Sequence, residues 1–309
     1  MMDFDEIANS CDLYGETSIA INHISALDNH YSKEELVQIY NYFLSVSQNP
    51  DVIMHLIRLS DRFRDKSTLS VLTDLLLINV PLEDKSLEER FVSVRSMCAK
   101  AIANYKDNDT VTTLLYCLNN KTEHYRVRLA CADALGKIGN KYAVAPLIEI
   151  VEDESEKSVY LRESAVTALG YLGDTRAVDS LVSILETKQG IINKFTFLKE
   201  RVIEALTKIM PADNERVFRA LKSSLSDESP QVRINAIEAL MESDYPNAYE
   251  TIKKCLRDDN LEVQKNALIA LYNMRGRDIL DEVVSLPSYG HNLKEEAKFM
   301  IEEYETDEE

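Results

Sequence analysis

Residues 125–152 read YRVRLACADALGKIGNKYAVAPLIEIVE, and residues 159–186 read VYLRESAVTALGYLGDTRAVDSLVSILE. The two segments align without a gap at an offset of 34 residues. Each has an arginine followed by the shared frame A-L-G-x-[IL]-G-[ND]-x-x-A-V-x-x-L-[IV]-x-I. A match of this length between neighbouring segments indicates an internal repeat.

Each half of the frame predicts one helix. Apolar residues recur at spacings of three and four, which draws an apolar stripe on each helix. Gly139 and Gly173 fall where a helix can end in a left-handed residue, and Asn140 and Asp174 follow as caps of the next helix. Small residues on the first helix allow two helices to approach closely: Ala130, Ala134, Ala168 and Gly170. One repeat is therefore a helix, a tight turn and a second helix.

The frame continues in both directions from these two segments. A basic residue near the start of the first helix recurs at regular intervals, as Arg95, Arg128, Arg162, Lys199 and Arg233, with Gln264 and Lys294 at the following positions. The small-plus-aliphatic pair recurs in step, from Ala101-Ile102 to Ala270-Leu271. We expect regular repeats over residues 94–275, degenerate helical repeats over residues 1–93 and capping helices over residues 276–309. No Pro/Gly/Ser-rich linker divides them, so the sequence predicts one continuous domain over 1–309.

These segments resemble the short HEAT-like repeats of the phycobilisome-lyase type. The resemblance implies an all-α fold, an α-solenoid of stacked antiparallel helix pairs with a right-handed superhelix. Such folds usually bind other macromolecules along a concave face.

Composition narrows the class of partner. The formal net charge of −18 opposes binding to nucleic acids and to anionic membranes. The N-terminus has no basic segment followed by an apolar one, and no apolar run is long enough to cross a bilayer. We therefore expect a cytoplasmic protein whose partner is another protein.

The basic ladder (Arg95, Arg128, Arg162, Lys199 and Arg233) has two interpretations. It could be a row of anion contacts, or each side chain could pair with a carboxylate of a neighbouring repeat. Strict periodicity favours the second interpretation, because stacked repeats need matching interfaces. The expected carboxylates are Asp133, Asp153, Asp174 and Asp227.

No pattern in the sequence indicates catalysis. There is no P-loop, nucleophile elbow or dinucleotide fingerprint. The five histidines include no His-Glu dipeptide, which argues against the paired-iron site of related HEAT-repeat oxygenases. The five cysteines lie in apolar helical contexts, with Cys11 and Cys255 the least clearly buried. We expect no catalytic residue, no metal site and no cofactor.

Two groups of residues are candidates for protein binding. The first consists of polar positions on or near the second helices, which we expect to line the concave face: Lys141, Glu149, Arg176, Asp179 and Ser183. The second lies in an insertion at 187–197, where an apolar patch of Ile191, Ile192 and Phe195 interrupts the frame.

The leading hypothesis is a non-catalytic scaffold or adaptor that grips a folded protein. The alternative, which the resemblance implies, is a bilin lyase subunit or a phycobiliprotein chaperone or degradation factor, with a phycobiliprotein as partner. A third hypothesis is an iron–sulfur assembly helper.

Overall fold

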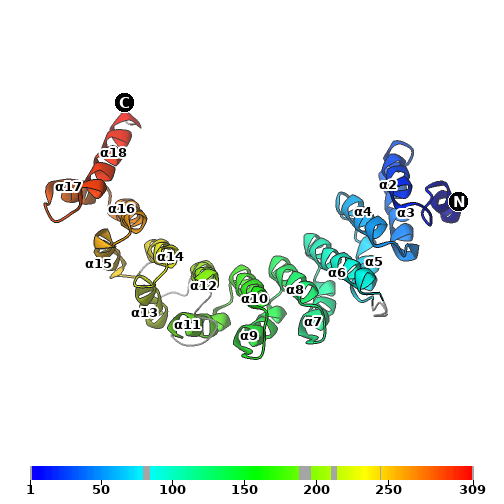
Figure 1. Ribbon diagram of the computed structural model, residues 1–309, viewed down its shortest axis with the longest axis horizontal. Helices are drawn as coiled ribbons and strands as arrows, with labels where there is room; N and C mark the ends of the chain where they lie inside the picture. The colour runs from blue at the N-terminus through cyan, green and yellow to red at the C-terminus, as the bar shows by residue number, and fades with distance from the viewer. Residues whose placement is uncertain (1, 79–83, 188–195, 210–213, 244, 308–309) are drawn as a thin grey trace. The chain divides into compact units, whose positions relative to one another are not determined.

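The computed structural model describes residues 2–78, 84–187, 196–209, 214–243 and 245–307. These ranges contain 18 α-helices and no β-strand (Figure 1). Helices α2 to α17 pair in chain order as first and second helices of eight repeats, between α1 (Phe4–Ser10) and α18 (His291–Asp307). The predicted α-solenoid of stacked helix pairs is confirmed.

The first helices of the pairs are α2 (Thr17–Ala26), α4 (Pro50–Asp61), α6 (Lys85–Tyr105), α8 (Tyr125–Ile138), α10 (Val159–Leu172), α12 (Thr196–Ile209), α14 (Pro230–Met241) and α16 (Leu261–Arg275). The second helices are α3 (Lys33–Val46), α5 (Thr68–Leu76), α7 (Val111–Asn119), α9 (Val144–Glu152), α11 (Val178–Glu186), α13 (Glu215–Ser224), α15 (Ala248–Lys253) and α17 (Asp278–Ser285).

The chain divides into two compact units, Met1–Ala168 and Leu169–Glu309. In the first unit, α4, α6 and α8 lie in one layer and α5, α7 and α9 in the other (Figure 1). Its core includes fully buried Tyr40, Phe43, Ile53 and Leu114. The second unit has its own core, which includes Leu181, Leu206, Leu240 and Leu271. One continuous domain over 1–309 and the handedness of a superhelix stay predictions.

The turn within each regular repeat forms as its sequence predicts. Gly139 (φ 83°) and Gly173 (φ 60°) are left-handed, which a residue with a side chain rarely adopts. The Asn140 and Asp174 side chains accept backbone N–H bonds from Tyr142 and Arg176. They cap short 3-10 turns, Lys141–Ala143 and Thr175–Ala177, that lead directly into α9 and α11.

Small residues set the spacing of the first helices. A Cβ atom added to Gly136 would lie 2.7 Å from the Ala168 Cα, and one added to Gly170 would lie 2.9 Å from the Ala205 Cα. Both distances are shorter than the closest contact between two non-bonded carbon atoms, and the nearest atoms belong to the backbone of the neighbouring helix. Neighbouring first helices therefore pack with their backbones almost in contact.

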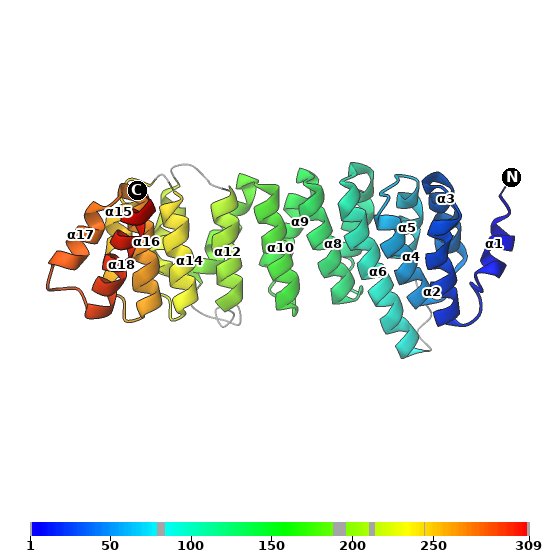
Figure 2. The same ribbon diagram turned by 90° about the horizontal axis from the view of Figure 1, so that it is seen from above.

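Two features distinguish the N-terminal part from the regular repeats. Helix α1 is N-capped by Asp3, whose side chain accepts the Asp5 and Glu6 N–H groups. Helix α6 has 21 residues where α8 and α10 have 14. Arg95 is thus the eleventh residue of α6, whereas its counterpart Arg128 is the fourth of α8. Figure 2 shows the N-terminal end of α6 reaching past that of α8.

The contact at Gly136 predicts a large cost for any side chain there. Gly136→Val should lower the free energy of unfolding by about 2 kcal/mol or more, because α8 must move away from α10. The urea midpoint, followed by far-UV circular dichroism, measures this loss. Lys137→Val, at an exposed position of the same helix, should show only the small helix-propensity cost of valine. Equal midpoints for the two variants would contradict the close packing.

Candidate functional site

The five polar candidates lie in the layer of second helices or in the turns that precede them. Lys141 and Glu149 are exposed in the first unit, and Arg176, Asp179 and Ser183 are exposed in the second. Arg216 of α13 donates to the Asp179 Oδ1 at 2.8 Å, to the Ser183 Oγ at 3.2 Å and to Glu186 at 2.7 Å. Asp179 and Ser183 therefore tie two neighbouring repeats together. Their role in binding a protein, and a concave location, stay predictions.

The apolar candidates Ile191, Ile192 and Phe195 lie outside the described residues. The next helix begins at Thr196, so Phe197 and Leu198 are helical, as expected.

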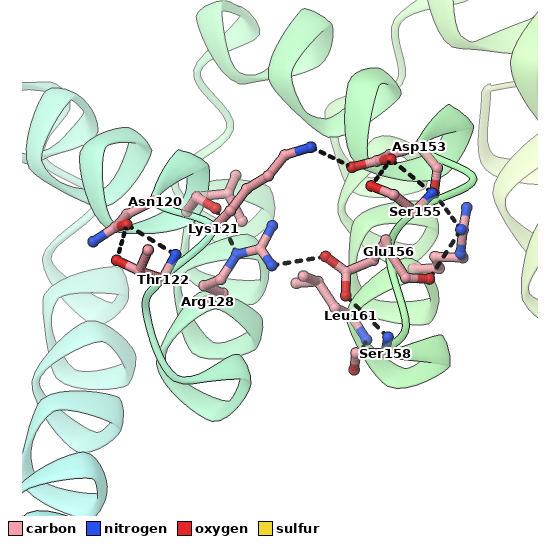
Figure 3. Close-up of polar contacts among 11 residues, drawn as sticks. Asn120, Lys121, Thr122, Arg128, Asp153, Ser155, Glu156, Ser158 and Leu161 are labelled. Carbon is pink, nitrogen blue, oxygen red and sulfur yellow. Dashed lines mark hydrogen bonds and ion pairs between the residues drawn. The ribbon is translucent and has the colours of Figure 1, made fainter.

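Two ladder residues of the first unit, Arg95 and Arg128, follow one geometric rule, and Figure 3 shows the contacts of Arg128. Arg128 of α8 donates from Nε to the Leu118 carbonyl at 2.9 Å, at the end of α7, and from Nη1 to Glu156 at 2.7 Å, before α10. Arg95 does the same with the Leu76 carbonyl at 2.8 Å and with Glu123. Each arginine thus satisfies a free carbonyl at a helix end and reaches the loop before the next repeat.

The ladder varies from this rule further along the chain. Arg162 donates only to backbone carbonyls, those of Val151, Asp153 and Glu156. In the second unit Lys199 pairs with Asp227 at 2.6 Å. Arg233 pairs with Asp258 at 2.7 Å and also donates to the Asp227 carbonyl. Every one of the five side chains therefore contacts a neighbouring repeat.

Only one of the carboxylate partners was predicted correctly from the sequence. Of the four expected residues, Asp227 pairs with a ladder residue, whereas Asp153 pairs with Lys121, and Asp174 with Arg176. The ladder partners that were missed are Glu123, Glu156 and Asp258. A constant spacing of 28 residues in three of the pairs (Arg95–Glu123, Arg128–Glu156 and Lys199–Asp227) could have revealed Glu123 and Glu156.

Each of these carboxylates also accepts a hydrogen bond from a backbone N–H in its own loop. Glu156 accepts the Ser158 N–H at 2.9 Å, and Asp227 accepts the Ser229 N–H at 3.0 Å. Burial would raise the pKa of Glu156, but the Ser158 N–H and the Arg128 guanidinium outweigh it and lower that pKa. The charged carboxylate is therefore held in the folded state.

A cavity of about 500 Å³ opens in the first unit beside the extended part of α6. The apolar walls of this α6 cavity are formed by Leu77, Ile78, Phe91, Val92 and Tyr116. Its polar lining includes Glu88, Arg95, Glu123 and His124. Cavities of this size can enclose a small ligand or a side chain of a partner.

Next to the α6 cavity, the outer face of α7 and α9 carries two strongly exposed tyrosines. Tyr116 has 67% of its surface exposed, and Tyr142, in the turn before α9, has 84%. The exposed positions of α7 and α9 include uncharged Thr112, Asn119 and Ala145 as well as charged Glu149 and Glu152. Exposed tyrosine is enriched at protein interfaces.

All five cysteines are buried and free of disulfides, including Cys11 and Cys255, which the sequence had left least certain. Burial raises the pKa of Cys98, and it raises that of Cys255 to about 11. Across the described ranges, no three His, Cys, Asp or Glu side chains are grouped so that they could hold a metal ion. No helix in those ranges combines the length and apolarity needed to cross a bilayer.

Comparison with known proteins identifies the family. The model of HEAT repeats matches residues 79–159, 122–199 and 218–286, which together make up more than half of the chain. This chain belongs to the HEAT-repeat family. The resemblance to HEAT-like repeats of the phycobilisome-lyase type is also confirmed.

Two curated relatives share part of this HEAT-repeat chain. Phycocyanobilin lyase subunit alpha of Picosynechococcus is 36% identical over 119 residues, which cover 34% of this chain and 42% of that protein. The bilin biosynthesis protein PecE of Mastigocladus laminosus is 40% identical over 65 residues, which cover 21% of this chain and 23% of that protein. The chain therefore spans less than half the length of either relative.

Among solved structures, a chain in the complex of Kap95p with RanGDP has a TM-score of 0.52 at 12% identity. The alignment covers 95% of this chain and 50% of that one. At this identity, the likeness concerns the HEAT-repeat fold alone.

The ladder geometry predicts different costs for two arginines of one helix. Arg128→Leu should lower the free energy of unfolding by about 3–5 kcal/mol, because it leaves the buried Glu156 without its cation. Arg126→Leu removes an exposed ion pair with Glu89 and should change stability little. Urea unfolding of both variants measures the difference. Equal, small losses would show that the ladder does not hold the repeats together.

The lowered pKa of Glu156 predicts a pH dependence. A depressed carboxyl pKa stabilises the fold above the unfolded pKa of about 4.3, and this stabilisation is lost as pH falls through the lower folded-state pKa. The stability difference between wild type and Glu156→Gln should therefore be full at pH 7 and shrink below about pH 4. Urea midpoints measured from pH 7 to 3 test this. The exposed neighbour Glu154 provides the control, Glu154→Gln, whose difference from wild type should stay small throughout.

Proposed function

We propose that this chain is a subunit of a bilin lyase, or of a closely related factor that handles a phycobiliprotein, and that it works by binding other proteins. The observation that carries the proposal is the 36% identity over 119 residues with phycocyanobilin lyase subunit alpha. The shorter match to a bilin biosynthesis protein supports it independently. The name of the first relative describes a subunit, which supports a protein partner for this chain as well.

The fold suits such a role. Each HEAT repeat contributes one helix pair to an extended surface, and side chains along that surface can contact a partner without a deep active site. The face with Tyr116 and Tyr142 is one part of the first unit suited to such contacts, because both rings are largely exposed.

The scaffold or adaptor hypothesis is the second candidate. The same tyrosine-bearing face supports it, since a protein interface needs no bilin. The two functions differ in whether a bilin is involved, and the relatives favour the lyase-type subunit. The iron–sulfur hypothesis has no supporting observation in the residues described.

The lyase proposal predicts a change in visible absorbance. The purified chain is mixed with phycocyanobilin, an apo-phycobiliprotein and a candidate partner subunit, and the bilin spectrum is recorded against each component alone. We expect the spectrum to shift and the bilin to remain with the phycobiliprotein after denaturation only when this chain is present. Serum albumin in place of this chain controls for unspecific bilin binding.

An unchanged spectrum in every combination would overturn the lyase proposal. Crosslinking mass spectrometry on a native pull-down then distinguishes the adaptor. Crosslinks from one enriched protein to the α7–α9 face or to residues 140–257 would support that function, and their absence would exclude it.

A further inference from the structure

The extension of α6 is not needed for the ladder contacts of its repeat. Arg95 already makes the ladder contacts of this repeat. In α8 the helix begins three residues before Arg128, whereas α6 begins ten residues before Arg95. Helix α6 therefore has seven additional residues at its start, Lys85–Phe91. Extra helical turns that the repeat does not require point to a local function.

The extension is fixed on both sides. Arg90 pairs with Asp51 of α4. On the other side, Glu89 lies 3.3 Å from the Arg126 guanidinium and 4.0 Å from the His124 imidazole. These contacts link the extension, which forms one wall of the α6 cavity, to α4 and to the start of α8.

The charges of the lining favour a cationic occupant. Both terminal nitrogens of Arg95 are bound to Glu123, and its Nε is bound to the Leu76 carbonyl. The positive charge of Arg95 is therefore already neutralised inside the protein. Glu88 also lines the cavity, and within the described residues it has no ion pair. One carboxylate is thus left over, in a chain whose net charge is −18.

The aromatic rings of the lining point to the same chemistry. Phe91 lies one helical turn after Glu88 on α6, and Tyr116 belongs to the lining from α7. A guanidinium group stacks on aromatic rings and binds a carboxylate through two parallel N–H groups. A carboxylate ligand would instead meet the negative charge of Glu88, which repels it, since Glu123 is already paired with Arg95.

The cavity also adjoins the exposed face of α7 and α9. Tyr116 belongs both to the cavity lining and to the exposed face of α7 and α9, and Leu77 at the end of α5 is likewise exposed. A partner that covers this face would bring its own side chains to the mouth of the cavity.

We propose that the α6 cavity is the receptor for an arginine side chain of a protein partner that docks on the α7–α9 face. Glu88 binds the guanidinium, and Phe91 and Tyr116 enclose it. This proposal needs a protein partner but no bilin chemistry, so it stands or falls separately from the lyase function.

Methyl NMR of the full chain tests the proposal. Signals of Leu77, Ile78 and Val92, all in the cavity lining, are followed while the blocked peptide acetyl-Gly-Arg-Gly-amide is added. Matched peptides with norleucine or glutamate in the central position serve as ligand controls. We expect saturable shifts of these signals with the arginine peptide, weakening as salt is added, and little response to the other two.

Two variants test the role of Glu88. Glu88→Gln keeps the size of the side chain and should weaken arginine-peptide binding by about fivefold or more. Asp74→Asn removes an exposed charge of α5 outside the cavity and should leave the affinity unchanged. Unfolding midpoints equal to wild type show that both variants fold.

Three results would overturn the proposal. The first is a lack of response to the arginine peptide, and the second is equal affinity of wild type and Glu88→Gln. The third is preferred binding of the glutamate peptide, which would make the cavity an anion site centred on Arg95. The bilin experiment has an independent readout, so the failure of one proposal does not imply that of the other.

Discussion

Stacking of the repeats depends on one recurring arrangement, in which a cation on the first helix of five consecutive repeats bonds to a neighbouring repeat. Arg128 shows it in full, with the Leu118 carbonyl on one side and Glu156 on the other. The carbonyl at the end of a second helix lacks an intrahelical partner, and the loop carboxylate is partly buried, so both need this cation. Because the carboxylate also accepts an N–H in its own loop, a single residue shapes the loop and joins two repeats.

The sequence was sufficient to predict the elements that obey local rules. Gly139, Gly173, Asn140 and Asp174 act as expected, because left-handed ends and side-chain caps depend on residues next to each other in the chain. The partners of the ladder were mostly missed. Glu123 and Glu156 lie 28 residues from their arginines, and no local rule connects positions so far apart until the stacking of the repeats is known.

The candidate site was less predictable than the fold, for a related reason. From the sequence, binding residues were expected at repeated positions and in the insertion. Two of these residues, Asp179 and Ser183, contact Arg216 of the next repeat. The α6 cavity depends instead on where a helix starts. Residues 85–91 continue the polar and apolar spacing of α6 without a distinctive motif. Glu88 and Phe91 line a cavity only because the fold brings Tyr116 of α7 to the same place.

The length of α6 has a consequence for how such a protein can evolve. The ladder contacts of its repeat begin at Arg95, and the cavity wall is made by the turns before it. A cavity wall can therefore be added to a repeat, altered or removed by changing the start of one helix, while the ladder contacts are left as they are. The ladder contacts and the cavity wall are encoded in adjacent but separate stretches of the same helix, which makes this repeat a natural acceptor for grafted binding sites.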